Sequence, residues 1–253
     1  MKTTPISRRI ALAALASLPV AARSVRYGAA EDDVNAVIKR AVDGMAKVKS
    51  FHFKMETLDG TATIMGSLEL RGVEGDVVRP ASFQATLDAK ASIVAVDVQV
   101  VSIDGSVWIT NPLQAGKWEQ VANGAEAGDG SISTLTSLIN PDRLFLIALQ
   151  VLEDPSIDGN EDIDGTATTR VVGQFDPDSI STLTGLGTAT PVDLPNTDFL
   201  SSDPVDLRFW IANDGKVLRI EEEGPLTDTE SRDVLRRFSF TDFDNPVDIE
   251  PPI

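Results

Sequence analysis

SISTLTSLINPDRLFLIALQVL, residues 131–152, is a helical interruption in a chain that otherwise alternates like β-sheet. Asn140 is a suitable N-cap, and Pro141 suits the first helical position, where a missing N–H costs nothing. Asp142 then lies at the positive end of the helix dipole. Nearly every side chain from 144 to 152 is apolar, so this helix must be covered on several sides. At roughly 12 residues it is too short to cross a bilayer. The two ways to cover it are a sheet that curls over it, which makes it a plain core helix, or a sheet together with an apolar ligand.

The flanking sequence predicts β-strands joined by tight turns. Asp-Gly pairs at 59–60 and 104–105 mark two of these turns. An amphipathic helix is expected over 31–49, and a further helix opens at Asp176 and is expected to run to about 187. Alternation or β-branched runs predict strands over 51–56, 61–70, 76–78, 83–87, 92–103, 106–110, around 118, and over 166–175, 205–212, 216–223 and 232–243.

Successive strands with short turns predict a meander, and so many twisted strands must curl. We therefore expect an α+β fold in which one large, curved antiparallel sheet carries helices on one face. No internal repeat or long linker divides the chain, so residues 31–253 are expected to form a single domain.

The first 30 residues have the pattern of an export signal. A basic start with Arg8 and Arg9 precedes a short apolar run at 10–22, too short for a transmembrane span. The region around the two arginines is similar to a twin-arginine signal, although Ala11 replaces the usual aromatic, so both export routes stay open. We expect a protein exported to the cell envelope or the extracellular space.

The formal net charge of −17 argues against nucleic acid as a partner and against electrostatic docking to anionic headgroups. The predicted signal holds basic residues and no acidic ones, so the remainder is more acidic still. The chain has no cysteine, which excludes disulfides, thiolate catalysis and Cys-based metal sites.

Residues that could carry catalytic chemistry find little support in their surroundings. His52, the single histidine, shares the polar side of its strand with Lys54 and Glu56, and no nucleophile motif accompanies it. The acidic run at 221–223 is interpreted as charge on exposed edges and turns. Core packing is the default for the three tryptophans on strands, which are Trp108, Trp118 and Trp210.

The segment DGNEDIDG at 158–165 begins like a calcium-binding loop. Ile163 stands where that loop needs glycine, and Thr169 stands where it needs a bidentate glutamate. A hairpin turn explains the run better. We expect no metal, no cofactor and no enzymatic activity.

Several segments, in order, resemble the actinobacterial LppX/LprA/LprF/LprG lipoprotein family. The resemblance covers nearly all of the chain after residue 30, and the order and spacing of the motifs carry it. The resembling segments are Ser50-Phe51-His52, Gly75-Asp76-Val77 with Pro80, residues 101–108 with Trp118 downstream, Ile139–Leu144, residues 164–173, residues 205–211 with Gly215, and residues 238–252. Phe145 departs from the family pattern.

The resemblance implies a LolA/LolB-like half-barrel whose concave side is covered by helices, with an apolar cavity between sheet and helices. It also implies that this cavity holds the acyl chains of a lipid or lipoglycan in transit across the envelope, without catalysis. The expected lining residues come from the helices at 131–152 and 176–187 and from the first strand: Leu135, Leu138, Ile139, Leu144, Phe145, Ile147, Ala148, Val151, Ile180, Leu183, Phe51, Phe53 and Met55.

One departure from the family bears on anchoring. Its lipobox cysteine is missing, so we expect a protein that is not lipid-anchored, acts as a monomer and touches membranes transiently. The alternative function is an envelope sensing or interaction domain on the same scaffold, with a protein partner and no transport role.

Overall fold

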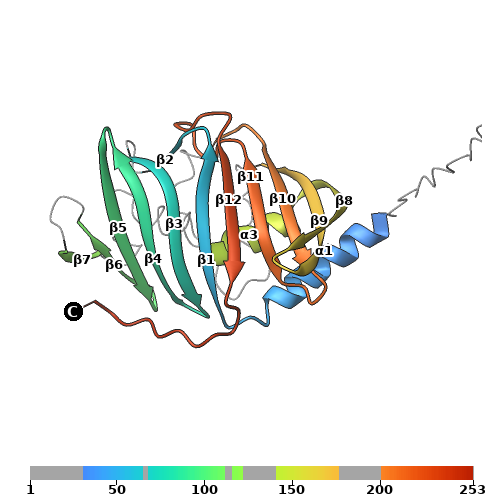
Figure 1. The fold of residues 1–253 in the computed structure, drawn as a ribbon, viewed down its shortest axis with the longest axis horizontal. Coiled ribbons are helices and arrows are strands. Elements are labelled where there is room, and N and C mark those ends of the chain that lie inside the picture. Colours follow the sequence, from blue (N-terminus) through green and yellow to red (C-terminus); the bar gives the residue numbers. More distant parts are fainter. Residues whose placement is uncertain (1–30, 65–67, 112–115, 122–140, 177–200, 253) are drawn as a thin grey trace, which may run out of the picture.

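The computed structural model describes residues 31–64, 68–111, 116–121, 141–176 and 201–252. In these residues, twelve strands form one open, twisted antiparallel sheet, and two helices accompany it (Figure 1). The helices are α1 (Glu31–Met45) and α3 (Pro141–Gln150). The strands are β1 (Ser50–Asp59), β2 (Ala62–Ile64), β3 (Leu68–Val78), β4 (Ser82–Ala91), β5 (Val94–Ile103), β6 (Ser106–Thr110), β7 (Trp118–Val121), β8 (Glu153–Ile163), β9 (Thr166–Phe175), β10 (Val205–Ala212), β11 (Val217–Glu223) and β12 (Leu235–Thr241).

The strand order is β7-β6-β5-β4-β3-β1-β12-β11-β10-β9-β8, with β2 paired to β3 beside this path. Two meanders, β3 to β7 and β8 to β12, therefore meet at β1, which pairs with β3 on one side and β12 on the other. The predicted meander is confirmed within each half. The first strand lies at the centre of the sheet because the last strand of the chain returns to cover its free edge (Figure 1).

The strict alternation of β1 separates the two faces of the sheet. Phe51, Phe53 and Met55 are buried in the core, whereas Lys54 is exposed and His52 is half-buried. Because side chains on a strand point to alternate faces, the apolar set marks the face that the helices cover and the polar set marks the opposite face. We call these the inner face and the outer face.

Helix α1 covers the inner face at the end of the sheet formed by β8 to β10, and it also contacts α3. Val37, Ala41 and Met45 recur at helical spacing and are buried in the core. The helix comes very close to the β10–β11 turn, because a Cβ atom added at Gly44 would lie 2.7 Å from the backbone of Gly215. The predicted helix over 31–49 is confirmed, although it ends at Met45.

Helix α3 begins at Pro141, as its capping signals predict, and packs against the core through Ala148 and Leu149, which are buried. In Figure 1 it lies behind the middle of the sheet. Neither described helix is long and apolar enough to span a membrane.

Two predictions of strands are wrong. The single strand expected over 61–70 is in fact β2 and the start of β3, which pair with each other through Ala62 and Leu70. Apolar periodicity continues across the reversal, and only Gly66 could have signalled it. Strand β8 was missed because it is an edge strand exposed along most of its length, and therefore lacks a buried face to pattern it.

Candidate functional site

The inner face is a continuous apolar surface that spans the sheet and both helices. Phe51, Phe53 and Phe209 are fully buried at its centre. Phe51 packs against Phe240 in an edge-to-face arrangement, with 5.8 Å between the ring centroids. The apolar side chains of the described sheet and helices therefore gather on this face.

The structure describes five of the thirteen predicted lining residues fully. Phe51, Phe53 and Met55 are buried in the core with Ala148, and Val151 is partly buried against them, so strand β1 and helix α3 do face a common interior. Leu144, Phe145 and Ile147 lie on α3, but their side chains are outside the described residues, as are the whole residues Leu135, Leu138, Ile139, Ile180 and Leu183.

A small apolar cavity lies between the helices and the sheet. Its volume is about 20 Å³, which corresponds to one or two water-sized spheres and is far too small for an acyl chain. The walls are supplied by α1, α3 and strands β1, β10, β11 and β12, through Met45, Phe51, Pro141, Asp142, Leu149, Phe209, Val217, Ile220 and Phe240. Asp142 is the charged residue among them, and it stands at the rim.

Asp142 is held by Arg79, which follows β3 in the chain. Arg79 Nε donates to both carboxylate oxygens, at 2.9 and 3.0 Å, and Nη2 donates to Oδ1 as well. Nη1 donates to the carbonyl oxygens of Met45 and Val48, at the end of α1. This ion pair therefore ties the start of α3 to the end of α1 and to the sheet.

The sequence did not predict the pairing of Arg79 with Asp142. Both residues lie in or beside segments that resemble the family motifs, and the position of Asp142 beside the helix dipole was predicted. Their separation of 63 positions, however, gives no sequence signal that they meet.

A second buried ionic cluster lies on the inner face, where β11 and β12 meet the 224–234 loop. Arg236 Nη1 donates to Glu222 Oε1 at 2.5 Å, and Nη2 donates to Glu230 Oε1. All three side chains are at most 4% exposed. Burial raises the pKa of Glu222 to about 7. The charge of Arg236 lowers this pKa, but Arg236 is shared with Glu230, whose negative charge raises it.

Glu222 overturns the prediction that the run at 221–223 is charge on exposed edges. Strand β11 is an internal strand between β10 and β12, so alternate residues of the run point to the inner and the outer face. Glu222 points inward and is buried, while Glu221 and Glu223 pair with arginines outside.

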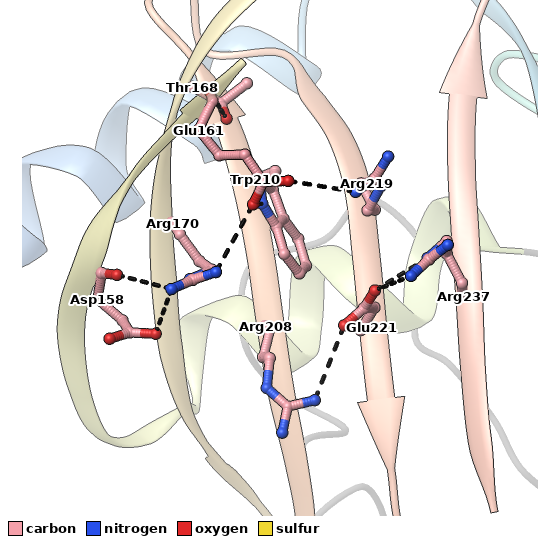
Figure 2. A network of polar contacts seen from close by, with 9 residues as sticks. All are labelled: Asp158, Glu161, Thr168, Arg170, Arg208, Trp210, Arg219, Glu221 and Arg237. Atoms are coloured by element: carbon pink, nitrogen blue, oxygen red, sulfur yellow. Dashed lines mark hydrogen bonds and ion pairs between the residues drawn. The ribbon is translucent and has the colours of Figure 1, made fainter. Parts of the chain in front are cut away.

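The outer face of β8 to β12 is covered by an ionic network around Trp210 (Figure 2). The indole Nε1 donates to Glu161 Oε2 at 2.7 Å. The guanidinium carbons of Arg170 and Arg219 lie 5.8 and 5.5 Å from a ring centroid of Trp210, close enough for cation–π contact. Glu221 joins the network by accepting from Arg237 at 2.6 Å.

The prediction that the tryptophans pack in the core holds only in part. Trp210 is buried at 3% exposed, but on the outer face among arginine side chains and outside the main apolar cluster, and Trp108 and Trp118 are half-buried. An arginine pair on flanking strands shields an indole as well as apolar neighbours do, and periodicity alone does not distinguish the two environments.

The outer face of β1, β3, β4 and β5 holds a wider hollow of about 730 Å³ that reaches Trp118 on β7. His52 lies here on the polar side of its strand, as predicted, with Nδ1 2.9 Å from Asp76 Oδ1. Gln84 Nε2 donates to the other oxygen of Asp76 at 2.9 Å. Charged and amide groups line this hollow together with apolar residues such as Val101 and Trp118. An acyl chain placed here would displace the hydration of the polar groups.

The hairpin turn predicted for the run 158–165 is confirmed only at Asp164 and Gly165, which have positive φ and join β8 to β9, whereas residues 158–163 belong to strand β8. Within the part of the chain that the structure describes, no group of three or more His, Cys, Asp or Glu residues could hold a metal ion.

Comparison with known proteins agrees with this architecture. The crystal structure of LprF from Mycobacterium bovis has a TM-score of 0.56 at 17% identity, covering 87% of this chain and 97% of LprF. Lipoprotein LppX from Mycobacterium tuberculosis has a TM-score of 0.54 at 16% identity, covering 87% of this chain and all of LppX. The predicted α+β fold, with a large curved antiparallel sheet and helices on its concave face, is confirmed.

The sequence comparisons extend over most of the chain. Lipoprotein LprA of Mycobacterium tuberculosis is 28% identical over 204 residues, which are 79% of this chain and 76% of LprA. The family model described as LppX_LprAFG lipoprotein matches residues 33–249. The chain belongs to the LppX_LprAFG lipoprotein family.

Proposed function

We propose that this protein is an exported, non-enzymatic lipid carrier that holds the acyl chains of a lipid or lipoglycan between the sheet and its helices. The observation that carries the proposal is the inner face, where α1 and the apolar helix α3 are the described helices that cover a wide apolar sheet. A carrier needs no catalytic group, and the function rests on apolar burial alone.

A lipid that crosses an aqueous space on a carrier must keep its acyl chains away from water. Each methylene group buried away from water contributes about 0.8 kcal/mol, so a sixteen-carbon chain requires on the order of 12 kcal/mol of shelter. The cavity of about 20 Å³ among the described residues does not provide this shelter. We propose that the ligand replaces part of the packing between α3 and the sheet, exchanging one set of apolar contacts for another.

Exposed aliphatic side chains support transient membrane contact. Ile93 is 91% exposed and Val94 is 59% exposed, at the turn that joins β4 to β5. Two adjacent exposed aliphatic residues at a hairpin tip suit shallow insertion among acyl chains rather than attraction to charged headgroups. This agrees with the acidic charge of the chain.

An envelope interaction domain with a protein partner is the second candidate. The hollow of about 730 Å³ on the outer face favours it, because a lining of charged groups beside apolar side chains such as Val101 and Trp118 suits a peptide or a protein loop. A stoichiometric protein partner recovered without lipid would support this function and contradict the carrier.

The carrier function is tested by lipid transfer between vesicles with an Ala148→Trp variant. Ala148 is 4% exposed on the inner surface of α3, so an indole there should occupy the space that an acyl chain needs. We expect loss of transfer while the circular dichroism spectrum stays that of the folded protein. Ala36→Trp, on an exposed position of α1, is the matched control and should transfer normally. Equal transfer by both variants would exclude this interior as the lipid site.

A further inference from the structure

Arg79 lies beside the apolar cavity, in contact with Asp142 and Phe51, which both line it. Its guanidinium carbon lies 5.9 Å from the ring centroid of Phe51, and Phe51 lines the cavity together with Asp142. The side chains of Arg79 and Asp142 are 16% and 15% exposed, so both are mostly withdrawn from water. No basic residue is among the described residues that line the cavity itself, which leaves Arg79 as its neighbouring cation.

The guanidinium of Arg79 has two kinds of partner. Nη1 is fixed by the carbonyl oxygens of Met45 and Val48, which belong to the end of α1 and to the sequence that follows it. Nε and Nη2 form a two-pronged contact with the Asp142 carboxylate. The carbonyls therefore hold the cation in place, while its anion is supplied by α3.

Entry of an acyl chain disturbs the contact between Arg79 and the Asp142 carboxylate, and leaves the contacts of Arg79 with the two carbonyl oxygens in place. Pro141 and Asp142 form part of the cavity wall, so a chain that widens the cavity on this side displaces the first turn of α3. Arg79 then keeps its two carbonyls but loses its carboxylate. A mostly buried cation without its counter-ion is strongly unfavourable, so a ligand that brings its own anion opens the cavity at lower cost than a neutral ligand.

We propose that Arg79 binds the phosphate or other anionic group of a lipid headgroup, and that Asp142 occupies the position of this anion in the empty protein. The proposal rests on the carrier function and deepens it by naming the ligand class, an anionic lipid. Arginine fits this role because its planar fork binds phosphate in the same two-pronged geometry as carboxylate.

Two other arginines in the described residues, Arg236 and Arg71, do not offer the same site. Arg236 is enclosed by two buried glutamates, Glu222 and Glu230. Arg71 lies on the outer face, half-exposed, paired with Asp88 at 2.5 Å. Arg71 therefore provides a control with the same chemistry away from the apolar interior.

The test compares two lipids with identical acyl chains, phosphatidic acid and diacylglycerol, presented to the wild-type protein and scored by native mass spectrometry. We expect a preference for phosphatidic acid of about tenfold or more, since a charged hydrogen-bonded pair contributes on that scale. Arg79→Met should reduce this preference to near unity, and Arg71→Met should leave it unchanged. Arg79→Lys, which keeps the charge without the fork, should retain part of the preference.

Three further results support or contradict the role of Arg79. Asp142→Asn removes the competing carboxylate and should raise uptake of phosphatidic acid, so a fall would contradict the displacement. Equal uptake of both lipids by the wild-type protein would overturn the role of Arg79 and leave the carrier function standing, whereas uptake of neither would overturn both. Glycerol phosphate or inorganic phosphate competing as well as phosphatidic acid would indicate a site for free anions and contradict a lipid headgroup site.

Discussion

Glu222 and Arg236 occupy positions where a lipid carrier would be expected to have only apolar side chains. Arg236 balances one of the two carboxylates around it, so the buried cluster carries an excess negative charge when both glutamates are ionised. Such a cluster fixes the 224–234 loop on the inner face, because Glu230 Oε2 also accepts from the backbone N–H of Leu226 at 2.7 Å. Losing one partner would leave another charge buried and unpaired.

Stability should fall as the pH rises through the range in which Glu222 ionises. Its pKa is raised from 4.5 to about 7 by burial. Between these values the folded state binds a proton that the unfolded state has lost, so the extra stability is full below about pH 4.5 and gone above about pH 7. Urea unfolding of wild type and Glu222→Gln, near pH 5 and near pH 7.5, should differ in pH dependence by on the order of 3 kcal/mol at most.

The control for this measurement is Glu223→Gln on the same strand, which removes an exposed carboxylate paired with Arg208. It should keep the pH dependence of the wild type. If Glu222→Gln also keeps it, the ionisation of Glu222 does not govern stability in this range.

Gly75 is required because strands β3 and β4 come unusually close. A Cβ atom at this position would lie 2.1 Å from the carbonyl oxygen of Gln84, a collision that backbone atoms cannot avoid cheaply. We expect Gly75→Ala to lower the free energy of unfolding by about 1–3 kcal/mol, measured in urea. Gly72→Ala, 3.1 Å from the carbonyl oxygen of Met55, should cost clearly less. Equal losses would show that the close approach at Gly75 is unimportant.

At the scale of single residues, sequence reasoning succeeded where burial follows periodicity and failed where charge is buried. Phe51, Phe53 and Met55 were placed correctly by strict alternation. Glu222 and Trp210 were misplaced, because charged side chains on neighbouring strands decide their environments. No local pattern contains those partners.

At the scale of elements, capping and turn chemistry located most segments. Helix α3 begins at Pro141 as predicted, and the hairpin formed by β10 and β11 turns at Asn213-Asp214-Gly215. Edge strands are the weakness of this reasoning. Strand β8 is exposed on both faces and contains acidic residues, Pro155 and Gly159. These residues are typical of a loop, but on an edge strand they discourage pairing with the edge of another sheet.

The turn between β4 and β5 should govern membrane contact without affecting lipid binding in solution. Replacing Ile93 and Val94 with serine removes the exposed aliphatic tip while leaving the core untouched. We expect several-fold weaker association with neutral vesicles, on the order of the transfer cost of two aliphatic side chains, measured by flotation. Binding of a water-soluble short-chain lipid should be unchanged. Undiminished flotation would assign membrane contact to another surface.

At the scale of the whole molecule, the sequence predicts the α+β class and the curved sheet, but not the order of its strands. The pairing of β1 with β12 joins residues near the two ends of the described chain, and its register follows from side chains that no local window includes. Resemblance to the family supplied the overall arrangement, in which helices cover the concave face. The small size of the cavity among the described residues could not be predicted, because it depends on packing among six elements.

The carrier function requires that the interior between the sheet and the helices admits acyl chains. The most direct test is native mass spectrometry of the protein purified without detergent from a lipid-containing host, followed by organic extraction of any bound molecule. The carrier function predicts excess mass that extracts as an acyl lipid, or excess mass that appears after incubation with lipid vesicles. A protein that stays ligand-free under both conditions would contradict it, because the inner face would then be a permanently filled core.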